Sequence, residues 1–236
     1  EQRPSVMPEC DFHIGIPVMA RFHGEIVNTG LDYLAAHSLT DTGAVLDLSR
    51  LSSRLQPKNS LGFSQDWTLL SGGFKAGDQY FSCSVSHRLS GMFRYTDDLI
   101  RLLYQGNGAF VGKPLDFSSC GIEVSRYLEF DLGYQRRIDE RWTVGARLKR
   151  LYGQDNISVH PSTLSATTAA TDYTLKLQSD LVVNTCSPVI DGGSIDPLRF
   201  ANGGWAFSGG ISYQFRPSWL FSFDVTDLGW IRWKSS

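Results

Sequence analysis

The 236-residue sequence lacks a long apolar run, since no stretch approaches the roughly 18 apolar residues of a membrane-spanning helix. It also lacks an excess of charge of one sign, because 22 basic and 24 acidic residues give a formal net charge of −2. Nucleic-acid binding would need a basic stripe, so no nucleic-acid partner is predicted. Cysteine is scarce. The four residues, Cys10, Cys83, Cys120 and Cys186, could form two disulfides in any of three pairings, although free thiols are favoured.

The sequence motifs of common enzymes are absent as well. The five histidines are scattered without metal-ligand spacing, and no HExxH, GxSxG, P-loop or GxGxxG occurs. The segment Asp191–Asp196 could touch Ca²⁺, but it is not an EF-hand and a polar turn is favoured. Glu123, Glu129 and Asp131 could act as general acid or base, yet the polar face of a strand predicts the same row without chemistry. The sequence therefore predicts a non-enzyme with no catalytic residue, cofactor or metal site.

What the sequence does contain is alternation, most clearly in Gln79–Tyr95. Its odd positions, such as Phe81 and Val85, are mostly apolar, and its even positions are mostly polar. Side chains alternate across a strand, so this stretch predicts a strand with one apolar and one polar face. Soluble strands usually have about five or six residues, whereas a tilted strand that crosses a bilayer needs about 9–11. The length of this stretch favours the second kind of strand.

The same alternation predicts nine or ten strands in all. The others are Asp11–Pro17, Phe22–Asn28, Leu61–Lys75, Cys120–Ile138, Trp142–Tyr152, Ile157–Ser165, Thr171–Asn184, Trp205–Arg216 and Trp219–Thr226. Tight turns are expected near 76–78, 139–141, 166–170 and 217–218, with another short connection at 153–156. Matching the faces of the strands that flank 139–141 places Asp131 opposite Lys149.

Two short helices are predicted between strands. Residues 45–55 carry leucines at helical spacing. A second helix begins at Asp97, with Thr96 as the N-cap and Gly106 as the C-cap. Residues 1–60 are expected to be an irregular start and 61–236 a series of regular hairpins, so that 1–236 forms one domain.

Alternation alone does not say which face is wet, because a soluble β-sandwich shows the same pattern. Long strands, tryptophans near strand ends and polar faces with charges of both signs favour a membrane barrel with a hydrophilic lumen. The polar row predicted to face the lumen is Glu123, Glu129, Asp131, Arg147, Lys149, Lys176 and Asp180. The residues predicted to face lipid or form aromatic girdles are Phe81, Val85, Trp142, Trp205, Trp219, Trp230 and Trp233.

Several segments also carry a resemblance to a known family. They are Tyr95–Leu99, Gly121–Glu123, Gly145–Lys149 and Phe223–Ile231. These segments resemble a Bacteroidota family of outer-membrane β-barrels of unknown function, which is itself similar to FadL-type barrels. The resemblance covers about residues 60–233 and implies a Gram-negative outer-membrane protein whose signal peptide has been removed. Members of the family continue into further strands, so this chain is expected to be part of a larger barrel.

Together these observations predict an all-β fold, a transmembrane antiparallel up-and-down β-barrel with short helices in its loops. The predicted function is a non-enzymatic scaffold or a subunit of an outer-membrane secretion or assembly complex. The predicted partners are membrane lipid and other outer-membrane or periplasmic proteins. Two alternatives stay open: FadL-like transport of hydrophobic molecules, and a soluble β-sandwich that acts as a binding module.

Overall fold

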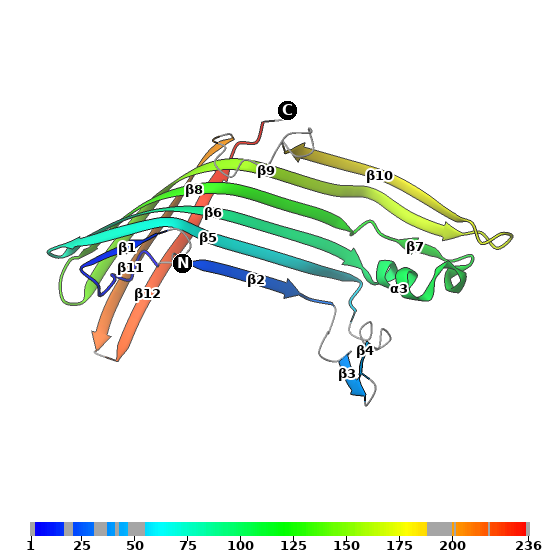
Figure 1. Ribbon diagram of the computed structural model, residues 1–236, viewed down its shortest axis with the longest axis horizontal. Helices are drawn as coiled ribbons and strands as arrows, with labels where there is room; N and C mark the ends of the chain where they lie inside the picture. Colours follow the sequence, from blue (N-terminus) through cyan, green and yellow to red (C-terminus); the bar gives the residue numbers. More distant parts are fainter. Residues whose placement is uncertain are drawn as a thin grey trace.

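A computed structural model describes residues 3–16, 21–30, 37–40, 43–46, 55–187, 200, 202–216 and 218–234. Its main feature is a 10-stranded sheet in a single curved layer (Figure 1). Every strand pairing in the described part of the chain is antiparallel, which confirms the predicted all-β, up-and-down arrangement. The sheet is open, because β12 at one edge pairs with neither β1 nor β2 at the other within the described residues.

Every predicted strand is present with bounds that differ by at most a few residues, except that the strands predicted over Trp142–Tyr152 and Ile157–Ser165 are one strand. The strands of the sheet are β1 (Phe12–Gly15), β2 (Phe22–Asn28), β5 (Lys58–Ala76), β6 (Gln79–Thr96), β7 (Pro114–Asp116), β8 (Gly121–Arg137), β9 (Trp142–Thr168), β10 (Leu175–Cys186), β11 (Gly203–Arg216) and β12 (Trp219–Ile231). The path through the sheet is β1-β5-β6-β8-β9-β11-β12, with β2 added on β5 and with β7 and β10 added on β9. A separate two-stranded sheet consists of β3 (His37–Thr40) and β4 (Gly43–Leu46).

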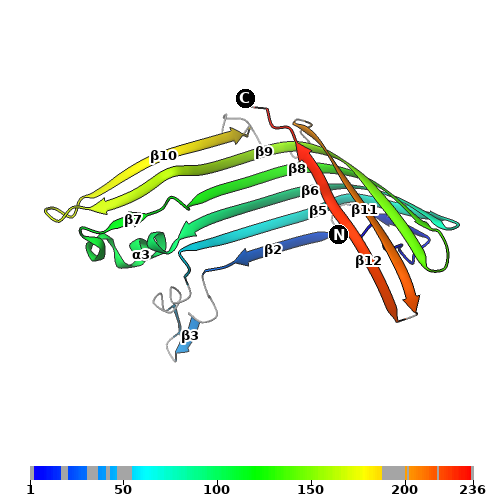
Figure 2. The ribbon, with the colours of Figure 1, turned by 180° about the vertical axis from the view of Figure 1, so that it is seen from behind.

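Three tight connections lie at one end of the long strands, which we call the turn end. They join β5 to β6, β8 to β9 and β11 to β12 (Figures 1 and 2). Gly77 adopts φ 63° in the first of them, a left-handed conformation that glycine accepts without steric cost. In the second, the Asp139 carboxylate accepts the backbone N–H groups of Arg141 and Trp142. The predicted register beyond this turn is confirmed, because Asp131 lies opposite Lys149.

The prediction of a short connection at 153–156 is wrong. Strand β9 runs without interruption for 27 residues, and its ladder with β8 continues across a β-bulge, where Arg126 pairs with Asp155 and Tyr127 with Gly153. A bulge inserts one extra residue without ending the strand, so Gly153 and the polar residues after it imitate a turn in the sequence. As a result the β9–β10 turn lies at the end opposite the turn end, which we call the loop end.

The predicted helix after β6 is confirmed as α3 (Asp97–Gln105), at the loop end. Thr96 caps it by accepting the N–H of Leu99, and the Gly106 N–H donates to the Leu102 carbonyl. Leu99 and Leu102 pack on a small core of Leu115, Phe117 and Ala166. No helix among the described residues is long and apolar enough to cross a membrane.

Two other expectations fall wholly or partly outside the described residues. Most of the helix predicted over 45–55 lies there, and at its start Gly43–Leu46 forms strand β4 instead. The segment Asp191–Asp196 also lies outside the described residues. All four cysteines are free.

Candidate functional site

The two faces of the sheet have the reverse of the exposure expected in a soluble sandwich. On the polar face Glu129 and Lys149 are only 3% and 2% exposed, whereas Leu132 on the opposite face is 63% exposed. A sandwich would bury the apolar face and leave the charged face in water. We call the face that carries Glu129 and Lys149 the inner face, and the face that carries Leu132 the outer face.

Leu128 on the outer face is an exception to this pattern. It is fully buried, although its place in the alternation of Cys120–Ile138, on the same face as Phe130, predicts contact with lipid. The ring of Phe200 lies 5.9 Å from the ring of Phe130 and 5.1 Å from that of Tyr152, which is opposite Leu128 in the ladder. The Phe200 ring therefore packs over this part of the outer face.

The centre of the inner face is a network of ion pairs. The Lys149 ammonium lies 3.4 Å from Glu129 and also pairs with Asp227. Arg88 is 3.1 Å from Glu129 and 3.5 Å from Asp66, which extends the network from β9 through β8 and β6 to β5. Charges buried in this way need partners, because an unpaired buried charge is costly.

A second buried pair continues the network. Arg147 donates from Nε to both carboxylate oxygens of Asp131, at 2.9 and 3.1 Å. Asp131 thus pairs with the residue diagonally across the ladder, while Lys149, directly opposite, pairs with other carboxylates.

A β-bulge between β11 and β12 brings Asp227 into this network. The ladder shifts between Phe207 and Gly209, Asp227 adopts φ 57°, and its N–H donates to Ser208 Oγ at 2.9 Å. Bulges re-aim a side chain in this way. Asp227 was not among the predicted lumen residues, although the apolar positions of this strand change phase between Val225 and Leu228, and such a change is a signal for a bulge.

Not all residues of the predicted lumen row join the network. Glu129, Asp131, Arg147 and Lys149 come together, whereas Glu123 pairs with Arg94 at 2.7 Å in a position where both side chains are about two-fifths exposed. Lys176 and Asp180 lie on β10, where they are exposed. Arg88, Asp66 and Asp227 are the members that the predicted row omitted.

Aromatic residues form a row across the outer face near the turn end. The rings of Phe74 and Phe81 lie 5.4 Å apart, those of Phe81 and Tyr134 5.2 Å, and those of Trp142 and Tyr213 4.6 Å. Trp219, 60% exposed, lies at the same end of β12. We call these residues the turn-end row.

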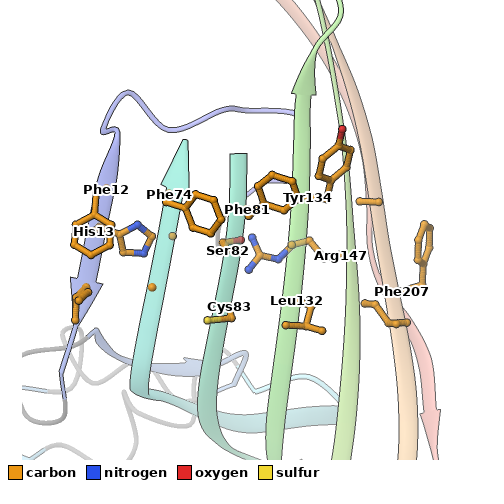
Figure 3. A pocket seen from close by; sticks show the side chains of 16 residues that line it. Phe12, His13, Phe74, Phe81, Ser82, Cys83, Leu132, Tyr134, Arg147 and Phe207 are labelled. Carbon is orange, nitrogen blue, oxygen red and sulfur yellow. The ribbon is translucent and has the colours of Figure 1, made fainter. Parts of the chain in front are cut away.

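An open hollow of about 640 Å³ lies beside the turn-end row on the outer face. Figure 3 shows Phe74, Phe81 and Tyr134 next to one another on neighbouring strands, with Cys83 and Leu132 farther along β6 and β8. Gly72 and Ala146 also line the hollow and leave room between the larger side chains. Its lining is almost entirely apolar, as is the exposed face around it.

A second aromatic group lies farther along the same strands. Trp205 is opposite Trp230 in the β11–β12 ladder, and both are exposed. The Arg150 guanidinium lies 4.8 Å from the centre of the Trp205 ring and 5.0 Å from that of Tyr152. We call Tyr152, Trp205 and Trp230 the loop-end row. Trp233 is not part of it, because its ring packs over Gly153, which is opposite the inner-face residue Tyr127.

The charged groups of the inner-face network are held by ion pairs with one another. No group of three or more His, Cys, Asp or Glu side chains in the described part of the chain could hold a metal ion. The sheet therefore has an inner face whose central charges are buried and paired, and an outer face that exposes large apolar side chains.

The sequence places the chain in a family. A model of a family of unknown function (DUF5723) matches residues 4–236. The chain belongs to this family. No curated protein and no solved structure matches it. The sequence resemblance predicted a family of unknown function, and the match agrees with that part of the prediction.

Proposed function

We propose that this member of the DUF5723 family is part of an outer-membrane β-barrel whose outer face contacts lipid. The main support is the spacing of the two aromatic rows. Trp142 and Tyr152 are separated by about 33 Å of strand at about 3.3 Å per residue. At a strand tilt of about 40°, this corresponds to about 25 Å, the height of the apolar band of an outer-membrane barrel.

We further propose that the protein acts as a non-enzymatic scaffold or as a subunit of an outer-membrane secretion or assembly complex. Its inner face carries charges of both signs that pair with one another, whereas a selective ion pore favours one sign. The resemblance to Bacteroidota and FadL-type barrels suggests transport of hydrophobic molecules as the alternative. The buried charges of Glu129 and Lys149 argue against an apolar conduit along this face.

Contact between the outer face and lipid is testable with a fluorescent label. In a variant that keeps Cys83 alone, an environment-sensitive dye on Cys83 is expected to emit at short wavelength and to be quenched by brominated acyl chains. The reason is that Cys83 is exposed between the two aromatic rows. The control carries the dye on Leu177→Cys, in β10 beyond the loop-end row, where emission typical of water and little quenching are expected. Equal, water-like emission at both positions would rule out a lipid-facing outer surface.

The scaffold proposal predicts little ion conduction. Full-length protein in planar bilayers is expected to show no large steady conductance, because paired side chains fill the inner face. Large steady currents would support a pore and contradict the scaffold proposal. Purification of intact complexes from native membranes would then identify the partner proteins.

A further inference from the structure

The first described residues of the chain lie on the inner face, between the ion-pair network and the turn end. The Val6 N–H donates to the Arg3 carbonyl at 3.2 Å, which closes a tight turn with Pro4 and Ser5 at its centre. Proline presets the backbone for this position of a turn. Both Pro4 and Ser5 are buried. We call residues 3–6 the N-terminal turn.

Four strands hold the N-terminal turn, three of them by polar contacts. Gln135 Nε2 on β8 lies 2.8–3.1 Å from the carbonyl oxygens of Arg3, Pro4 and Val6. Ser212 Oγ on β11 donates to the Ser5 carbonyl at 2.7 Å. Asp224 on β12 accepts both the N–H and the hydroxyl of Ser5, at 2.9 and 2.6 Å.

The fourth strand, β9, contributes a glycine, Gly145, that leaves room for the backbone of the turn. A methyl group at Gly145 would overlap the Pro4 carbonyl oxygen, and one at Gly210 on β11 would overlap Asp224 and approach the Ser5 nitrogen. Glycine inside a strand weakens it, and it often marks a site where another backbone approaches closely. Gly145 and Gly210 lie opposite each other in the ladder. Together they form the floor of a groove shaped for a peptide backbone.

We infer that this groove is a binding site for a proline-containing β-turn, and that the N-terminal turn is a plug that fills it. The plug contacts the groove only through its backbone and the Ser5 hydroxyl in the hydrogen bonds given above, so a detached peptide can make the same bonds. Without the plug, Gly145 and Gly210 would leave the inner face uncovered between the ion-pair network and the turn end. On the proposed function, the plug closes the lumen at the turn end.

The plug is tested by protection of a single cysteine at Ser212, beneath the Ser5 carbonyl. In a cysteine-free background, Ser212→Cys is expected to react with a water-soluble maleimide at least 10-fold more slowly than Ser222→Cys, its exposed neighbour in the ladder. Adding Asp224→Ala, which removes both acceptors for Ser5, is expected to abolish this protection. The milder Asp224→Asn, which keeps one oxygen, is expected to give an intermediate rate.

The groove is tested with a peptide in trans. In a chain without residues 1–8, a synthetic peptide of residues 1–8 is expected to restore protection of Ser212→Cys, and a peptide with Pro4→Gly and Ser5→Ala is expected to restore less. Equally fast labelling of both cysteines with the plug present, or no effect of the peptide, would overturn the inference. If the shortened chain does not fold, the Asp224 variants decide. Labelling is done in detergent and therefore does not depend on insertion into a bilayer. If Ser212→Cys is protected but the dye on Cys83 shows water-like emission, the proposed lipid contact fails and the proposed plug stands.

Discussion

Replacing Lys149 by methionine is expected to lower the free energy of unfolding by about 3–5 kcal/mol, the usual cost of removing one partner from a buried ion pair. The Lys149 ammonium is buried between Glu129 and Asp227. Methionine keeps most of the volume and removes the charge, so Glu129 would keep its pairing with Arg88 but lose that with Lys149. Urea unfolding in detergent micelles, followed by tryptophan fluorescence, measures the loss.

The matched control is Arg94→Met in a similar ladder position nearer the loop end. Arg94 pairs with Glu123 at 2.7 Å, but their side chains are 41% and 42% exposed. Exposed ion pairs contribute about 0–1 kcal/mol, so this variant is expected to lose less than about 1 kcal/mol. If the two variants lost equal free energy at the same urea dependence, the inner face would be solvated and the buried network would not exist.

Much of the sheet was predictable because alternation reports which face a residue occupies. The register of Asp131 and Lys149 followed from matching the apolar positions of two strands across a three-residue turn, and the structure confirms it. The helix after β6 followed from Thr96, two aspartates and Gly106, which are local capping signals. In both cases the deciding interaction lies close in sequence or repeats along the strand.

The errors arise where one extra residue changes the phase. The bulge near Gly153 made one strand look like two, and the bulge near Asp227 moved a carboxylate from the apolar to the polar side. In β5 strict alternation from Trp67 predicts Leu69 on the outer face, but a third bulge puts Leu70 there instead. A bulge is stabilised by partners on other strands, as Ser208 stabilises Asp227, so periodicity within one strand could reveal the shift but not its cause.

The ion-pair partners and the N-terminal turn were beyond the sequence for a related reason. Arg88 and Glu129 are far apart in the chain, and Asp131 pairs with Arg147 diagonally across the ladder, a choice that strand periodicity does not encode. Nothing in Pro4 and Ser5 themselves indicates that they lie on β9 and β11. The sequence indicates the position of the turn only indirectly, through Gly145 and Gly210, which lie inside otherwise regular strands and mark a close approach of another backbone.

Replacing Leu132 by arginine is expected to have the largest effect on the outer face. Leu132 lies between the aromatic rows, because its ladder partner Leu148 is six residues from Trp142 and four from Tyr152 on β9. An arginine on the lipid face of a barrel costs about 2–4 kcal/mol near the bilayer midplane, and about 0–1 kcal/mol near the interface. The variant is therefore expected to fold into phospholipid vesicles with a free energy of unfolding about 2–4 kcal/mol below that of the unmodified protein.

Leu177→Arg is the matched control, because Leu177 on β10 has the same exposure as Leu132, 63%. It lies beyond the loop-end row, where the charge would be hydrated, so a loss of less than about 1 kcal/mol is expected. In a soluble protein both substitutions would place a charge on an exposed surface, and such surface changes usually stay within about 0.5 kcal/mol. A difference between the two variants in vesicles thus depends on the surrounding lipid, and two equally small losses would mean that water, not hydrocarbon, surrounds Leu132.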